Sequence, residues 1–172
     1  MKPTKRRILL GTLIAIGGVI LTVAALQQPL SGQEALRVVE VEQLKDNLYL
    51  LKGGGGNASA FVTETGVVLV DTKNPGWGQP LLAAIGSVTS NPVTMIINTH
   101  THGDHVSGNV ELAENIEIVA HENTETNMQE MRSNSSNPPS NAPSRNIFRE
   151  NNGKGMPTQT FADRMTIGSG NN

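Results

Sequence analysis

The sequence predicts an α+β domain built around a metal-binding loop. Strand-like segments occupy much of residues 36–71 and are separated by hairpin signals, which is typical of an antiparallel meander. A segment with helical spacing then precedes a short apolar strand, Val93–Asn98. Three of the four histidines and an aspartate follow this strand within residues 100–105. A strand leading directly into such a cluster indicates that the domain carries its chemistry there.

Composition excludes several classes of function. The 172 residues suit one domain with a real core. A net charge of −2 gives no basic face, so we expect no nucleic-acid partner. There are no cysteines, which rules out disulfides and thiolate metal sites.

The N-terminus carries a targeting pattern. Basic residues at positions 2, 5, 6 and 7 precede the apolar run Ile8–Leu26, which as a helix would span about 28 Å, one bilayer core. One interpretation is a cleaved export signal ending near Ala25, and Arg6-Arg7 is similar to a twin-arginine signal. The other is an uncleaved anchor with its basic end in the cytoplasm. Residues 1–28 are therefore interpreted as a signal peptide or membrane anchor, residues 29–35 as a linker, and residues 36–172 as the domain. We expect an exported protein, periplasmic or anchored to the outer face of the cytoplasmic membrane.

The remaining elements follow from local patterns. A run of four glycines, Gly53–Gly56, lacks the Lys-Ser/Thr of a nucleotide-binding loop and is interpreted as a flexible hairpin connection. The segment Ser133–Pro157, rich in Ser, Asn and Pro, is expected to be irregular. We expect strands at Leu36–Val41, Asn47–Leu51, Ala58–Thr63, Val67–Val70, Val93–Asn98 and Ile116–Ala120, one or two more within Thr158–Ile167, and helices at Gln79–Ser87, residues 108–114 and Asn123–Met131.

The spacing of the ligand types in the central loop predicts a metal site. His100 and His102 are two residues apart, so in an extended segment both rings point to the same side. Gly103 allows a sharp turn, after which Asp104 and His105 can face a second point. Imidazole and carboxylate are ligands of zinc, iron(II) and manganese, so four ligands on one loop can serve two adjacent ions.

This stretch, followed by Ser107-Gly108-Asn109, resembles the H-x-H-x-D-H signature of the metallo-β-lactamase fold superfamily. The resemblance implies an αββα sandwich and one or two zinc ions, with iron or manganese as alternatives. His100 and His102 would bind the first ion, and Asp104 and His105 the second. Asp71 ends an apolar strand. It either caps the next turn or, as the resemblance implies, lies beneath the metal loop and orients it.

The resemblance also implies a reaction type. A metal-bound hydroxide would attack an ester, thioester or lactam-type bond of a small-molecule substrate. Asp104 is the candidate catalytic residue, because it would hold the second ion and could orient the nucleophile or pass its proton. His121 matches a strand-end histidine that does not bind metal in the family.

The resemblance covers about residues 36–167 and predicts a sandwich that is incomplete at the C-terminus. The family's later ligands, two histidines and an aspartate, have no matching motif, since only His121 and Asp163 follow His105. One face of the first sheet would then be bare. A homodimer that pools ligands would complete the site. The alternative is a truncated, non-catalytic remnant that binds metal weakly or acts as an interaction module.

Overall fold

The computed structural model describes residues 36–112, 114–130 and 146–168. The chain divides into two compact units, residues 1–36 and 37–172, and the described elements lie in the second. The expected signal or anchor and the linker lie outside the described residues, as does the larger part of the expected irregular segment. Within the described part of the chain, no helix combines the length and apolarity needed to cross a membrane.

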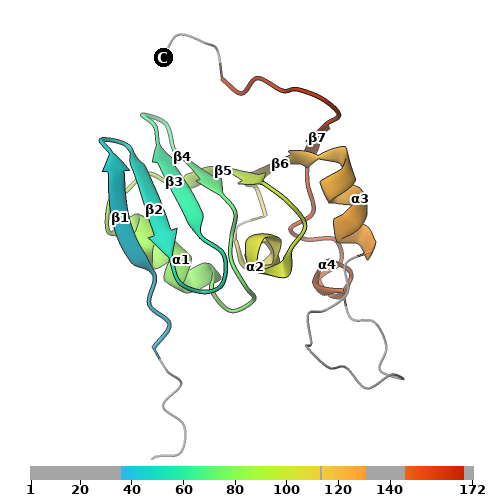
Figure 1. Cartoon of the computed structure of the whole chain (residues 1–172), viewed down its shortest axis with the longest axis horizontal. Helices are drawn as coiled ribbons and strands as arrows, with labels where there is room; N and C mark the ends of the chain where they lie inside the picture. The colour runs from blue at the N-terminus through green and yellow to red at the C-terminus, as the bar shows by residue number, and fades with distance from the viewer. Residues whose placement is uncertain (1–35, 113, 131–145, 169–172) are drawn as a thin grey trace, which may run out of the picture. The chain divides into compact units, whose positions relative to one another are not determined.

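Seven strands form one mixed sheet in the order β1 to β7 (Figure 1). Neighbours from β1 to β4 are antiparallel, and those from β4 to β7 are parallel. This confirms the predicted meander and the α+β class. The strands are β1 (Glu40–Lys45), β2 (Leu48–Lys52), β3 (Ala58–Val62), β4 (Val67–Val70), β5 (Val93–Asn98), β6 (Glu117–His121) and β7 (Gln159–Phe161).

The helices lie in the connections between the parallel strands, and α1 also packs against the antiparallel half of the sheet. They are α1 (Gly78–Gly86), α2 (Gly103–Val106), the 3-10 helix η1 (Ser107–Glu111), α3 (Glu122–Glu130) and α4 (Ile147–Glu150). Helix α1 crosses between β4 and β5, which makes their connection a βαβ unit. Its residues Leu81 and Ile85 are buried against alternating strand residues, because successive strand side chains point to opposite faces. The strand residues on this face include Leu51, Ala60, Leu69, Ile96 and Ile118.

The opposite face of the sheet is less completely buried. Its apolar side chains on β2 to β5 are half-buried or exposed, whereas most of those packed on α1 are buried. Phe61 is the most open of them, at 36% exposure. In the described part of the chain, α1 and α2 lie on the other side of the sheet (Figure 1). The face that was expected to be bare is therefore half-buried at most of its apolar positions in the described part of the chain. These positions are Leu48, Leu50, Phe61, Val68, Val70, Met95 and Ile97.

Two adjacent parallel strands place the candidate site. Val70 of β4 pairs with Ile97 of β5, so both strands end at the same edge of the sheet. Asp71 follows the first strand directly, and the histidine-rich loop follows the second. Carboxyl ends of parallel strands are the usual position of functional groups in such sheets.

The structure corrects several boundaries. The strand expected at Leu36–Val41 begins only at Glu40. The helix expected at residues 108–114 instead begins at Gly103, inside the histidine motif, and continues as η1 to Glu111. A helix that sequence analysis did not predict, α4, lies within the segment expected to be irregular. The Asn146 side chain caps it by accepting hydrogen bonds from the backbone N–H groups of Phe148 and Arg149.

Candidate metal centre

The three histidines of the loop gather at one place. The ring centroids of His100 and His105 are 4.1 Å apart, and those of His100 and His102 are 4.7 Å apart. His102 is the residue before α2, with extended backbone, and its carbonyl accepts the His105 N–H at 2.9 Å. The helix turn thus brings His105 back toward His100. The extended segment at His102 agrees with the sequence argument, but Asp104 and His105 lie on a helical turn, not on a simple bend.

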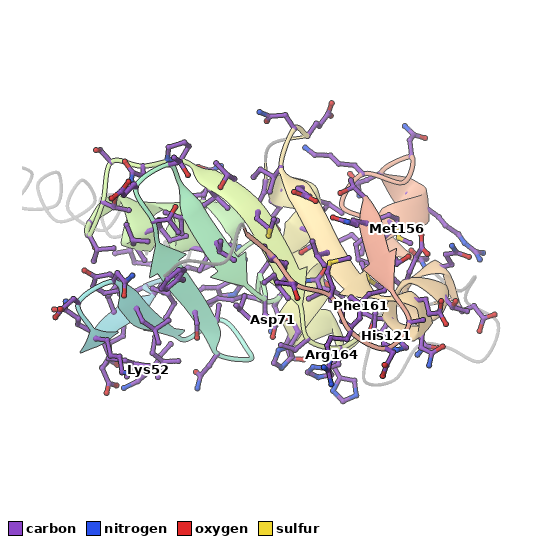
Figure 2. The ribbon with its side chains drawn as sticks, turned by 90° about the horizontal axis from the view of Figure 1, so that it is seen from above. Lys52, Asp71, His121, Met156, Phe161 and Arg164 are labelled. Carbon is purple, nitrogen blue, oxygen red and sulfur yellow. The ribbon has the colours of Figure 1, made fainter. Side chains whose placement is uncertain are left out.

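Asp71 connects the two ends of this loop. Its carboxylate, 4% exposed, accepts the Thr99 backbone N–H at 2.9 Å and the Thr99 hydroxyl at 2.6 Å. The same carboxylate lies 2.8 Å from Nδ1 of His105. Figure 2 shows Asp71 in the interior, close to the edge of the sheet. Of the two readings left open by the sequence, these contacts favour a carboxylate beneath the loop.

The hydrogen bonds fix the tautomers of two histidines. An ionised carboxylate only accepts, so Nδ1 of His105 carries the proton given to Asp71. The single proton of the Thr99 hydroxyl goes to Asp71, so that hydroxyl accepts from Nδ1 of His100 at 2.9 Å. In the neutral form of each ring, Nε2 is then the nitrogen without a proton, and it is the atom that can bind a metal ion.

Asp104 completes the group of candidate donors. Its side chain is 39% exposed, and its carboxylate lies 3.6 Å from Nε2 of His105. The described residues contain one cluster of three candidate donors, Asp71, His100 and His105, whose atoms lie within 4.8 Å of one another. Because Asp71 is hydrogen-bonded to Nδ1 of His105, we assign it to orienting that ring. Imidazoles with a neighbouring carboxylate are a donor set that fits zinc.

The glycine run forms a wall of this centre. It connects β2 to β3, which confirms the predicted hairpin connection. It is not a free loop, however. A Cβ atom at Gly55 would meet Asp104, and one at Gly56 would meet the His105 ring. Gly53, Gly54 and Gly55 also have positive φ angles, which glycine adopts without steric cost.

Sequence analysis missed a polar network behind the loop. Thr72 donates its backbone N–H to the His105 carbonyl at 2.7 Å and its hydroxyl to the Asn109 side chain at 2.6 Å. Asn109 in turn donates to the Asn98 side chain at 2.8 Å and to the Gly155 carbonyl at 2.9 Å. The Ser-Gly-Asn that follows the motif was the available signal for Asn109.

Lys73 was the second omission. Sequence analysis gave this residue no role, but its side chain is fully buried. Its ammonium donates to the carbonyls of Leu51 at 2.8 Å and Gly56 at 3.0 Å. Burial lowers the pKa of Lys73 from 10.5 to about 8, and the Asp71 carboxylate opposes that shift.

The fourth histidine lies outside the cluster. Nδ1 of His121 accepts the Asn123 N–H at 3.0 Å, and Nε2 lies 2.8 Å from the Ala162 carbonyl, to which it donates. Its ring packs edge-on against Phe161, as Figure 2 shows. Both ring nitrogens are therefore engaged, which agrees with leaving His121 out of the predicted ligands.

Solved structures of metallo-beta-lactamases are similar to part of this chain. The chain is similar to BJP-1, a subclass B3 metallo-beta-lactamase of Bradyrhizobium japonicum, with 22% identity, a TM-score of 0.51, and coverage of 76% of this chain and 46% of that one. It is also similar to a metallo-beta-lactamase from Erythrobacter litoralis, with 25% identity and a TM-score of 0.48, over 54% and 45% of the two chains. A B3 enzyme with an active-site glutamic acid has 24% identity and a TM-score of 0.47, over 51% and 35%.

The chain thus spans about a third to a half of the length of these structures. No curated protein matches it. The family model of the metallo-beta-lactamase superfamily matches residues 51–157, which is more than half of the chain and includes the whole histidine motif. The chain therefore belongs to the metallo-beta-lactamase superfamily.

Proposed function

We propose that this chain is a metal-dependent hydrolase in which His100 and His102 bind one metal ion and Asp104 and His105 bind a second. Zinc is the expected ion, with iron or manganese as alternatives. The observation that carries the proposal is the pair of Nδ1 contacts, His100 to Thr99 and His105 to Asp71, which leave Nε2 of both rings available to a metal ion. Fixing both tautomers before binding removes one cost of assembling the site.

The chemistry follows from the ion and its surroundings. A zinc ion held by these residues would polarise a substrate carbonyl and lower the pKa of water, which would favour hydrolysis at neutral pH. Asp104 is more exposed than Asp71 and faces the His105 ring, so it is the group that can accept a proton beside the substrate. We infer a small-molecule ester, thioester or lactam as substrate.

A specific observation supports a second candidate, a non-catalytic metal binder. Catalytic zinc usually has three protein ligands. In this proposal, the four loop residues provide only two ligands for each ion. A homodimer that pools ligands would restore three, and we propose it as the active form. A monomer that binds metal weakly would instead fit the non-catalytic alternative.

Hydrolysis assays with matched variants separate these candidates. The full chain, loaded with zinc, is tested on ester, thioester and lactam substrates with and without a chelator. We expect turnover that the chelator removes, that His100→Ala abolishes and that His121→Asn retains. The His121 variant is a matched control because both of its ring nitrogens are already engaged. No turnover on any substrate by zinc-loaded protein contradicts the hydrolase proposal.

We also propose that residues 1–28 direct export, either as a cleaved signal or as an anchor. The support is the basic-then-apolar pattern of these residues. A fusion of this segment to a reporter that is active only outside the cytoplasm tests the proposal. An inactive reporter contradicts it, and the size of the mature chain distinguishes cleavage from anchoring.

A further inference from the structure

We propose that Lys73 is a positioning residue of the metal centre, whose ammonium holds the glycine turn against Asp104 and His105. The glycine turn is defined as residues 53–56. This inference rests on the proposed metal-binding function. It concerns a residue that touches no candidate ligand directly and acts through the turn.

The contacts of Lys73 span the turn. Leu51 and Gly56, whose carbonyls accept its two hydrogen bonds, lie just before and at the end of the turn. The turn is also fixed at its centre, where the Asn74 backbone N–H donates to the Gly54 carbonyl at 3.1 Å. Residues 73 and 74 thus hold three carbonyls around the turn. A turn with several glycines has little conformational preference of its own, so these bonds define its position.

The backbone of Lys73 is fixed as firmly as its side chain. Its φ angle is 72°, which side-chain-bearing residues rarely adopt, and Asp71 has a φ angle of 63°. The Lys73 carbonyl accepts the Gly108 N–H at 3.0 Å, and the Asp71 N–H donates to the Ile97 carbonyl at 3.0 Å. Three consecutive residues therefore contact different parts of the centre. Asp71 contacts the two ends of the histidine loop, Thr72 contacts the polar network behind it, and Lys73 contacts the glycine turn.

Charge explains why an ammonium is stable at this buried position. Burial disfavours the charged form, and the Asp71 carboxylate favours it. The Asp71 carboxylate, which orients His105, thus also compensates the charge of the Lys73 ammonium, which holds the turn. Removing the ammonium would leave two carbonyls without their donor and Asp71 without its nearby cation.

The glycine turn also limits where the ligands can lie. There is no room for even one Cβ atom between Gly56 and the His105 ring, or between Gly55 and the Asp104 side chain. Movement of the turn would therefore open space beside both ligands. A looser pair of ligands binds a metal ion less tightly, because more freedom is lost on binding.

Lys73→Met tests the inference, since it removes the ammonium and keeps an unbranched side chain. Lys52→Met is the matched control: it makes the same change at a half-exposed lysine paired with Glu40 and Glu42, away from Asp71 in Figure 2. Zinc affinity is measured by chelator competition on the full chain. We expect at least a tenfold loss for Lys73→Met and less than a twofold change for Lys52→Met, as for residues that orient metal ligands.

Gly56→Ala tests the same wall and leaves the Lys73 side chain in place. Its added Cβ would displace the His105 ring, whereas Gly86→Ala, at the end of α1, meets nothing within 4 Å and is the matched control. A second readout needs no metal: the NMR signal of the His105 Nδ1–H, which is bonded to Asp71. We expect that signal to shift or broaden in Gly56→Ala and Lys73→Met, and to stay unchanged in both controls.

The two readouts separate this inference from the proposed function. A wild-type chain that binds no zinc refutes the metal site, while the NMR signal of the metal-free protein still decides whether Lys73 and the turn position His105. Wild-type zinc affinity together with an unmoved His105 signal in both variants overturns the inference. If Lys73→Met does not fold, Gly56→Ala still tests the step through which Lys73 acts: an unmoved His105 signal in that variant shows that the turn does not position the ring, and overturns the inference.

Discussion

Replacing Asp71 by Asn tests how the centre is preorganised. Asn keeps the size of Asp and tolerates the positive φ angle of 63° at this position. The carboxylate accepts three hydrogen bonds, from the Thr99 N–H, the Thr99 hydroxyl and Nδ1 of His105. An amide has one oxygen, so its NH₂ group must face at least one of these donors.

The magnitude follows from those contacts. A hydrogen bond to a charged group contributes about 1.5–3 kcal/mol. The three bonds share one carboxylate, and the amide oxygen keeps at least one acceptor, so we expect Asp71→Asn to lower the free energy of unfolding by about 2–4 kcal/mol. When the NH₂ group faces Nδ1 of His105, the ring must move its proton to Nε2. Metal affinity should then fall by about 10- to 100-fold, as for other groups that orient metal ligands.

Urea denaturation of the metal-free protein and chelator competition measure the two effects. Asp46→Asn, the same change at an exposed turn between β1 and β2, is the control, and we expect its stability to change by less than about 0.5 kcal/mol. The ¹⁵N chemical shifts of His105 report the tautomer directly. A loss of stability below about 1 kcal/mol, together with wild-type metal affinity and an unchanged tautomer, would refute the reasoning.

Three further predictions concern the surroundings of the centre. The pKa of Lys73 is about 8 in the folded protein and 10.5 in the unfolded chain, so the unfolded chain binds more protons between these two pH values. The metal-free protein should therefore gain about 3 kcal/mol of stability as pH rises through this window. Lys73→Met should lack this gain in pH-dependent urea titrations. Asn109→Ala removes a buried side chain that joins Thr72, Asn98 and Gly155, and should cost about 2–4 kcal/mol by the same titrations; a change below about 1 kcal/mol would contradict that role. Phe148→Ala empties a buried position packed with Val106 and Met128, and should cost about 3–5 kcal/mol by thermal unfolding, whereas a cost under about 1 kcal/mol would contradict the packing.

The histidine motif was predictable because its geometry is local. His100, His102, Asp104 and His105 lie within six residues, and a strand followed by a turn is enough to bring them together. Strands β3, β4 and β5 were also predictable, since alternating or continuous apolar residues end at clear turn signals. Residue spacing left Asp71 open, because nothing near it in the sequence shows what its carboxylate faces.

The support of the centre was not predictable because its contacts are long-range. Lys73 bonds to carbonyls 17 and 22 residues away, and a lysine in a polar loop is ordinarily exposed. The glycine run was interpreted as flexible, since the sequence does not show that His105 packs against it. Helix α4 was missed for a related reason: four residues with an Asn cap give a weak signal beside a segment rich in Ser and Pro.

The most direct test of the central claim is the zinc content of the purified full chain after dialysis, measured together with its oligomeric state. The account predicts one or two zinc ions per chain, a lower zinc content in His100→Ala and in His105→Ala, and an unchanged content in His121→Asn. A dimer that retains zinc would support ligands shared between chains. A wild-type chain that retains no zinc, or loop-histidine variants that retain as much as the wild type, would contradict a metal centre at this loop.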